Sequence, residues 1–381
     1  MAQVHRQVVR AVAAHGRATL MVLALALAGA AAQAQIRVGQ TVGLTGPVAA
    51  TVAETRQGAL LWIDAVNAQG GVNGQKIELQ TLDDQFDVQR TVDNAKQLID
   101  SGVIALFLTR GTPHNQALLP LLSASRIPLI GPSTGAMVLH KPVQPWVFNV
   151  RAAYQREAER AVAHLVNTGI TRVALVQVND SFGDDAVQGA LKALKTAGLS
   201  PAAHERYDRS KPDFSQLTPA VVNAQAQAVL YVGSGTAVVD GMKALRAAGS
   251  RAQLVTLSNN ASDGFIKQLG DVARGTIVSQ VFPSERSIST PMIKDVLALA
   301  KAKGIQNVSP AMVEGFAAAK VLVEGLRRAG RNPDRASLVQ ALERMQRVDL
   351  GGLDVSFSAQ DHSGLDYADL AIIGPDGRFQ R

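Results

Sequence analysis

The sequence predicts an α/β protein with two lobes, each built on a parallel sheet that helices flank. Short runs of Val, Ile and Leu alternate with segments of about ten to twenty residues that have helical periodicity. This alternation is typical of parallel sheets whose two faces are both covered by helices. About 347 of the 381 residues follow a predicted leader, which is more than one hydrophobic core usually supports.

An export signal is predicted over residues 1–34. Three arginines precede an apolar stretch over 18–30, and Ala32-Gln33-Ala34 has the small residues of a cleavage site. The apolar stretch is short for a membrane-spanning helix, and no later segment holds about 18 uninterrupted apolar residues. The chain has no cysteine, which excludes a lipid-anchored lipoprotein and any disulfide framework. We therefore expect a soluble protein of the bacterial periplasm.

The charge balance argues against nucleic-acid binding. Without the leader the chain has 35 Lys and Arg against 31 Asp and Glu, a net charge of +4, and these residues are scattered. Only 4% of the residues are aromatic. Nucleic-acid binding requires a concentrated basic face, so no nucleic-acid partner is predicted.

The predicted first lobe opens with a βαβ unit. A strand over 36–44 runs into a Thr45-Gly46-Pro47 turn, a helix follows over 48–68, and a strand over 77–82 ends in Asp83-Asp84. Polar residues gather where strands give way to helices, which is where open α/β sheets bind ligands. Thr45 is a candidate ligand residue on this ground. The rest of the lobe is predicted from strands over 103–109 and 127–131 and a helix over 91–101.

A stretch over 143–154 interrupts this alternation and is predicted to cross to the second lobe. The alternation of strands and helices then resumes. Its strands are expected near 172–178, 202–207, 228–233, 253–257 and 276–281, with helices over 184–197 and 237–248.

The C-terminal third breaks the pattern again. It is predicted to form helices over 292–303, 311–329 and 336–346, followed by strands over 354–358 and 367–373. We expect this part to cross back to the first lobe and then return, which makes a hinge and a closing cleft. The predicted N-terminal lobe is 35–152 plus 282–354, and the predicted C-terminal lobe is 153–281 plus 355–381.

Five segments together resemble a known family. Their order and spacing are similar to those of the leucine/isoleucine/valine-binding family of periplasmic solute receptors, the type I substrate-binding proteins of ABC importers. The resemblance covers nearly the whole mature chain and implies two flavodoxin-like lobes joined by three crossovers. The segments are Val42–Pro47, Asn67–Ile77, Asp83–Asp87, Ile127–Thr134 and Asn179–Gly183.

The segment after the strand over 103–109 is the first candidate for binding a solute. Thr112 suits an N-cap and Pro113 the first helical position, so free N–H groups of the helix are expected to face the cleft. Such a terminus accepts a carboxylate. Arg110 and Gly111 belong to the same loop, and the alternative is that these residues only cap a helix.

Ser133-Thr134-Gly135 repeats this arrangement after the next strand. In the family the corresponding loops hold the carboxylate of the ligand through hydroxyls and backbone amides. The resemblance carries this role to Thr112 and Ser133. At the third position Gly135 lacks a hydroxyl, and Thr134 stands beside it.

The opposite wall has five further candidates. Phe182 matches an aromatic position that closes over the ligand in the family, although an aromatic residue there also suits the lobe core. Arg151 and Tyr154 are candidates for the hinge side, with a solvated arginine as the alternative. Ser234 follows a strand in a segment where the backbone is expected to approach the ligand, or else to form a plain turn. Asn259 follows the next strand.

The segment Leu257-Ser258-Asn259-Asn260 departs from the family. Members that bind amino acids usually present a carboxylate here to the ammonium of the ligand. A buried ammonium without an anionic partner costs several kcal/mol, so ordinary aliphatic amino acids are disfavoured. Asp180 or Asp184 is an alternative partner for the ammonium. The alternative ligands are small carboxylates, aromatic acids, amides and urea-like molecules.

Enzyme functions find no support in the sequence. Hydrolase, metalloprotease and Walker-type motifs are absent, and there is no thiol nucleophile. Gly43-x-x-Gly46 lacks the third glycine of a dinucleotide fingerprint. His114 is expected on a helix surface, and Asp83, Asp84 and Asp87 on a solvated loop rather than at a cation. No catalytic residue, metal or cofactor is predicted.

These observations predict an extracytoplasmic receptor that binds a small carboxylate- or amide-bearing solute in the cleft between the lobes. The solute is expected to be amino-acid-like or an aromatic or aliphatic acid. The resemblance implies delivery to the membrane permease of an ABC importer. A sensory or regulatory ligand-binding protein of the same fold is the alternative, and we expect a monomer.

Overall fold

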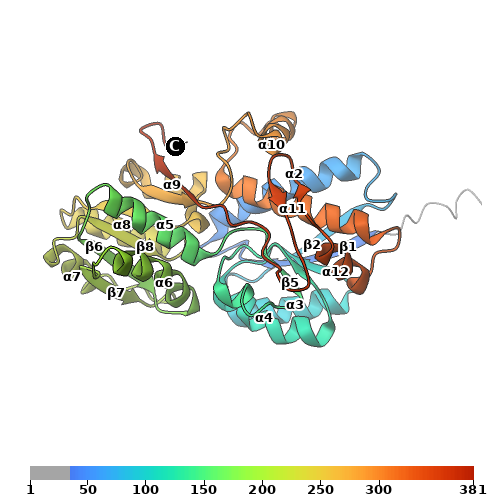
Figure 1. Ribbon diagram of the computed structural model, residues 1–381, viewed down its shortest axis with the longest axis horizontal. Helices are drawn as coiled ribbons and strands as arrows, with labels where there is room; N and C mark the ends of the chain where they lie inside the picture. Colours follow the sequence, from blue (N-terminus) through green and yellow to red (C-terminus); the bar gives the residue numbers. More distant parts are fainter. Residues whose placement is uncertain (1–34) are drawn as a thin grey trace, which may run out of the picture.

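Two sheets with the same parallel strand order form the centres of two lobes (Figure 1). The computed structural model describes residues 35–381, so the predicted export signal over 1–34 lies outside the described residues. In the first lobe the strands are all parallel and have the order β2-β1-β3-β4-β5. They are β1 (Ile36–Val42), β2 (Ile77–Asp83), β3 (Ala105–Phe107), β4 (Leu129–Ile130) and β5 (Val147–Phe148).

The sheet of the second lobe repeats this order and adds two strands at one edge. The parallel part has the order β7-β6-β8-β9-β10, so both lobes have the flavodoxin-like arrangement. The added strands β13 and β14 are antiparallel, which the predicted parallel sheet did not include. The strands are β6 (Val173–Val178), β7 (Ala203–Tyr207), β8 (Ala228–Val232), β9 (Gln253–Thr256), β10 (Ile277–Gln280), β13 (Asp369–Ile373) and β14 (Phe379–Gln380).

Helices cover both sheets. In the first lobe α11 packs along α2, and the small hairpin of β11 (Val348–Asp349) and β12 (Asp354–Val355) follows α12. The helices of this lobe are α2 (Ala49–Ala68), α3 (Val88–Asp100), α4 (Thr112–Ser125), η1 (Met137–Leu139), α10 (Pro291–Ala302), α11 (Pro310–Ala329) and α12 (Arg335–Glu343). Those of the second lobe are α5 (Tyr154–Asn167), α6 (Ser181–Thr196), α7 (Leu217–Asn223), α8 (Thr236–Ala247), η2 (Ser258–Asn260), α9 (Asp263–Leu269) and η3 (Gly270–Val272).

Side-chain caps set the starts of several helices. Asp87 accepts a hydrogen bond from the backbone N–H of Arg90, so α3 begins before the predicted start at residue 91. Asp180 accepts from the N–H groups of Phe182 and Gly183 and is the N-cap of α6, which agrees with the prediction that 179–183 begins a helix.

The chain passes between the lobes three times. The connections are the segments between β5 and α5, between β10 and α10, and between β12 and β13. Figure 1 shows the last of them in dark red, running from the first lobe on the right to the second lobe on the left. The predicted crossover over 143–154 begins too early, because β5 lies within it and pairs with β4 in the first sheet.

The buried residues separate into cores that follow the two lobes. The core of the second lobe is formed by residues of 154–278 and 371–379. The larger core of the first lobe takes residues from 36–152 and 281–357. Val355 and Phe357, which the predicted boundary assigns to the second lobe, pack in this first-lobe core because the chain has not yet crossed.

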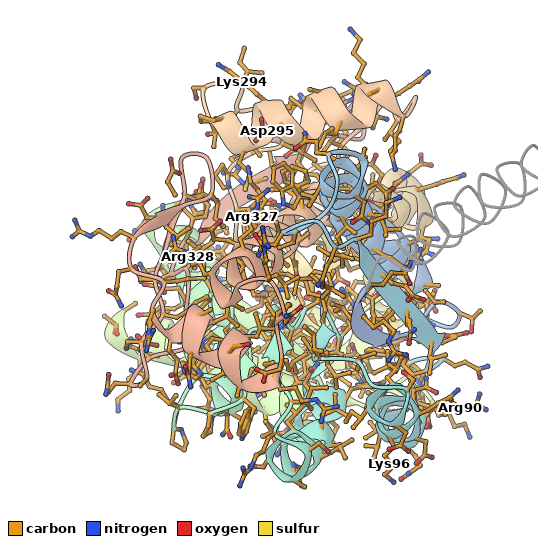
Figure 2. The ribbon with its side chains drawn as sticks, turned by 90° about the vertical axis from the view of Figure 1, so that its right-hand side faces the viewer. Arg90, Lys96, Lys294, Asp295, Arg327 and Arg328 are labelled. Carbon is orange, nitrogen blue, oxygen red and sulfur yellow. The ribbon has the colours of Figure 1, made fainter. Side chains whose placement is uncertain are left out.

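Charged side chains lie on the outer surface of the first lobe (Figure 2). The exposed ones on α3, α10 and α11 that the figure labels are Arg90, Lys96, Lys294, Arg327 and Arg328. Among the described residues, no helix is both long enough and apolar enough to cross a membrane.

Candidate functional site

The candidate site lies between the lobes, where the carboxyl ends of strands from both sheets face each other. A cavity of about 10 Å³, room for about one water molecule, lies there. A second cavity of similar size adjoins it in the first lobe and shares Arg110 and Ser133 with it. The cavity between the lobes is lined by Phe86, Arg110, Gly111, Thr112, Ser133, Tyr154, Phe182, Arg209, Ser234 and Asn259.

The lobes are closed on each other around this cavity. Arg110 Nη2 of the first lobe donates to the carbonyl oxygen of Asn259 in the second lobe, at 2.6 Å. The carboxylate of Glu54 on α2 accepts from the first backbone N–H groups of α9. Further contacts across the cleft join the hydroxyls of Thr51 and Ser262 at 2.9 Å and the Thr236 N–H to the Pro47 carbonyl at 3.2 Å.

Helix α4 directs its N-terminus toward the cavity. The N-cap is Gly111, not Thr112 as predicted, because Gly111 has φ of 96° and Thr112 already belongs to the helix. A Cβ atom at Gly111 would lie 2.4 Å from His114 Nδ1, so glycine is required for both its backbone angle and its packing. The Thr112 hydroxyl is instead hydrogen-bonded to that of Thr134 at 2.8 Å.

Arg110 is a buried cation whose close partners are neutral. Its guanidinium is 4% exposed and donates to the Asn259 carbonyl and, at 3.5 Å, to the Ser133 hydroxyl. Burial lowers the pKa of Arg110. The carboxylate of Glu314 attracts it from farther away, but that carboxylate is paired with Arg151. Among the described residues, no Asp or Glu lines either cavity.

Aromatic rings form the remaining walls. The rings of Tyr154 and Phe182 lie 4.7 Å apart, so Phe182 contacts both the cavity and the core of its lobe. Phe86 stacks on His114 at 4.3 Å. The guanidinium of Arg209 lies 5.2 Å from the centre of the Phe86 ring and pairs with Asp180 at 2.6 Å.

The prediction that His114 lies on a helix surface is wrong, because this residue is buried and only 1% exposed. The reason is that α4 turns this residue inward against Phe86. Burial lowers the pKa of His114 to about 4, so the ring is neutral at neutral pH.

Arg151 packs against Tyr154, a residue of the cavity lining, but does not itself line the cavity. The predicted alternative of a solvated arginine is wrong, since this side chain is 1% exposed. It pairs with Glu157 at 2.5 Å and with Glu314 at 3.4 Å, and its guanidinium lies 4.7 Å from the centre of the Tyr154 ring. Burial alone would lower the pKa of Arg151, but the two carboxylates raise it above its ordinary value. Arg151 therefore supports Tyr154 from behind.

The loops after β8 and β9 are tied together at the second-lobe wall. Asn259 Nδ2 donates to the Gly233 carbonyl at 2.9 Å and to the Ser234 hydroxyl at 3.0 Å. These bonds fix the orientation of the amide and leave Asn259 Oδ1 buried without a partner among the described residues. Asn260 turns away from the cavity and also bonds Gly233.

The structure brings most of the predicted ligand residues together. Arg110, Gly111, Thr112, Ser133, Tyr154, Phe182, Ser234 and Asn259 line the cavity. Thr134 and Arg151 contact residues of the lining but do not line the cavity themselves. Thr134 is hydrogen-bonded to Thr112, and the guanidinium of Arg151 lies over the ring of Tyr154. Thr45 does not reach it, because its exposed side chain donates to Asp83 at 2.6 Å.

The acidic loop after β2 is only partly solvated. Asp84, predicted to be solvated, is 1% exposed and accepts hydrogen bonds from the hydroxyls of Thr41 and Thr91. Its burial raises its pKa. Within residues 35–381 no group of acidic and histidine side chains has the arrangement of a metal site.

Two lining residues were not predicted, Phe86 and Arg209. Phe86 follows β2 and Arg209 follows β7. The rule that ligands bind at the carboxyl ends of strands, applied to every strand, would have found both.

The two α/β lobes, their three connections and the closed cleft at facing strand ends define a two-lobed solute-binding protein. The chain belongs to the periplasmic binding protein family, since the sequence model of that family matches residues 35–377. Within it the chain is a type I member of the Leu/Ile/Val-binding group. Proteins of this family bind substrates and are not enzymes, which confirms the predicted family and the absence of catalysis.

Individual relatives agree with this assignment. The chain is 25% identical over 309 residues to Leu/Ile/Val-binding protein homolog 3 of Brucella melitensis, covering 81% of this chain and 83% of that one. A substrate-binding periplasmic protein from Ralstonia solanacearum is 32% identical, with a TM-score of 0.84 over 91% of this chain and 99% of that one. A possible leucine/isoleucine/valine-binding protein from Rhodopirellula baltica is 26% identical, with a TM-score of 0.86 over 92% and 97% of the two chains.

Proposed function

We propose that this protein is a periplasmic receptor that binds a small carboxylate- or amide-bearing solute between its lobes and delivers it to the permease of an ABC importer. The observation that carries the proposal is the buried Arg110, whose partners in the cleft are a carbonyl and a hydroxyl. Buried charges in proteins are usually paired. A solute carboxylate at this guanidinium would supply the missing charge, and an amide oxygen would accept its hydrogen bonds.

Other donors surround the same point. The N-terminus of α4 attracts negative charge, and the hydroxyls of Thr112, Thr134 and Ser133 lie beside it. The rings of Phe86, Tyr154 and Phe182 supply apolar walls for the body of the solute. One end of the cleft therefore favours an oxygen-rich group and the other an apolar one.

Closure of the lobes would couple binding to transport. Arg110, Thr112 and Ser133 belong to the first lobe, and Phe182, Ser234 and Asn259 to the second. A solute that contacts both sets holds the lobes together and therefore shifts the population toward a closed form. That form has to leave more room between the lobes than the cavity of about 10 Å³ in this structure. Delivery to a permease rests on the family resemblance and on the predicted export signal.

A thermal-shift screen of the secreted protein, unfolded and refolded to remove co-purified solute, tests this function. The panel holds amino acids, aromatic and aliphatic carboxylates, amides and ureas. A ligand at about 100 times its dissociation constant should add about 2.7 kcal/mol to the free energy of unfolding. A folded protein that responds to no member of the panel would contradict the proposal.

A further inference from the structure

We infer that the solute is a monocarboxylate that carries no amino group. This inference rests on the proposed function, because it names the solute of the same cleft. It is drawn from the charges that line the cavity and from the partners that each nearby carboxylate already has.

One cationic side chain of this lining has no carboxylate at hydrogen-bond distance. The cationic side chains of the lining are Arg110 and Arg209. Arg209 is neutralised by Asp180 at 2.6 Å, whereas Arg110 has only neutral partners within hydrogen-bond distance. A solute carboxylate would give Arg110 a charged partner at hydrogen-bond distance, which a neutral or cationic solute would not.

No Asp or Glu of the described residues lines the cavity, so an ammonium group would find no carboxylate at its wall. Asp180 is held by Arg209 and caps α6, and Asp84 is turned to the hydroxyls of Thr41 and Thr91. Glu157 is bonded to Arg151, to the Ser279 hydroxyl and to the N–H of Ser258. A buried ammonium would therefore remain unpaired and next to the guanidinium of Arg110, which is unfavourable.

Two groups define what the solute meets instead. Asn259 Oδ1 is a buried neutral acceptor on the second-lobe wall, without a partner among the described residues. It suits a neutral donor such as a hydroxyl. Among the described residues, the buried carboxylates with an unpartnered oxygen are Asp185 and Glu314, and neither lines the cavity. The other oxygen of Glu314 faces Arg151.

The test compares solutes that share one carbon skeleton. Calorimetry on the refolded secreted protein, complete except for the predicted leader, measures the dissociation constants of four compounds. They are 3-phenylpropanoate, 3-phenyllactate, phenylalanine and 3-phenylpropanamide. The same set is repeated with the leucine skeleton, as 4-methylpentanoate, its 2-hydroxy acid, leucine and the amide. For each skeleton that the protein binds, both amine-free acids should bind at least tenfold more tightly than the amino acid and the amide.

A variant separates the role of Arg110 from a general loss of stability. Arg110→Gln should reduce the affinity for the acid at least tenfold and remove the preference for the acid over the amide. Arg335→Gln is the matched control, because Arg335 is a partly buried arginine that donates only to the main-chain carbonyls of Ser125 and Val103, away from the cleft. This control should bind as the wild type does.

The outcomes distinguish the inference from the function on which it rests. An amino acid or an amide that binds within tenfold of its amine-free acid, or more tightly, overturns the inference and leaves the receptor function standing. If an amino acid binds and Glu314→Gln abolishes that binding, Glu314 is the ammonium partner and the inference is wrong. A folded protein that binds none of these compounds, nor any solute of the wider panel, overturns both.

Discussion

Arg151 and Glu157 form an ion pair at the first connection between the lobes, with Nη2 and Oε1 2.5 Å apart. Both side chains of the pair are buried. Arg151 also contacts Glu314 on α11 of the first lobe and the hydroxyl of Ser258 in the second. One guanidinium thus joins both lobes at the hinge. Its role is to hold the hinge and to pack against Tyr154, whereas Arg110 lines the cavity between the lobes.

Replacing Arg151 by methionine should destabilise the protein strongly. The carboxylates of Glu157 and Glu314 would stay buried without their cation, and breaking such a pair costs about 3–5 kcal/mol. Urea unfolding followed by circular dichroism measures this loss. Arg335→Met removes an arginine that pairs with no carboxylate, and an equal loss in both variants would contradict the proposed role of the ion pair.

Gly235→Ala should prevent the lobes from closing. Gly235 has φ of 60°, and a Cβ atom there would lie 1.9 Å from the Pro47 carbonyl oxygen across the cleft. We expect at least a tenfold loss of solute affinity, and a radius of gyration in small-angle scattering that no longer falls when solute is added. Gly249→Ala is the control, since Gly249 also has a positive φ but its Cβ would meet open space. Equal affinities of the two variants would show that this contact does not limit closure.

Thr112→Val should weaken solute binding about 2- to 10-fold, because it removes a hydroxyl of the cavity lining that could donate to the solute, a hydrogen bond of about 1 kcal/mol. The bond to Thr134 is lost as well, so the free energy of unfolding should fall by about 1 kcal/mol while the protein stays folded. Calorimetry with the best ligand of the panel measures the effect. Thr196→Val, at an exposed position of α6, is the control, and unchanged affinity of the Thr112 variant would remove this hydroxyl from the site.

His114 should make the protein less stable in acid. Burial lowers its pKa from an ordinary value of 6.5 to about 4, so the unfolded chain takes up a proton at a higher pH than the folded one. The stabilisation is complete above pH 6.5 and is lost as the pH falls toward 4, by up to about 3 kcal/mol. His114→Phe keeps an aromatic ring against Phe86 and removes this dependence. Between pH 8 and pH 4 the urea midpoint of the wild type should therefore fall further than that of the variant. Equal falls in the two proteins would contradict the lowered pKa of His114.

The predicted leader should be removed on export. Mass spectrometry of the periplasmic protein should then show a chain that starts at Gln35, after Ala34. A variant with leucine at both Ala32 and Ala34 should remain unprocessed. If the wild-type protein stays in the cytoplasm with residues 1–34 still attached, the predicted export signal is wrong.

The arrangement of the site followed largely from local patterns. Arg110, Ser133 and Ser234 were placed at the cleft because each follows a strand, and parallel strands present their carboxyl ends at one edge. The same reasoning placed Thr45 there wrongly, because the carboxylate of Asp83 captures its hydroxyl. Phe86 was not predicted because its loop after β2 was expected to be solvated, and no candidate was predicted after β7, where Arg209 lies.

The sequence by itself determined the alternation of strands and helices, the family and the sheet edge at which the cleft lies, because these depend on periodicity, turn residues and the direction of each strand. Only the tertiary structure decided which buried arginine is paired. Arg110 and Arg151 both follow strands, and Glu314 stands 163 positions from Arg151 in the sequence. The packing of α11 on the first lobe brings the Glu314 carboxylate to within 3.4 Å of the Arg151 guanidinium, and Arg110 has no such contact. The antiparallel β13 was decided in the same way, since a strand that arrives from the other lobe can enter the sheet from either end.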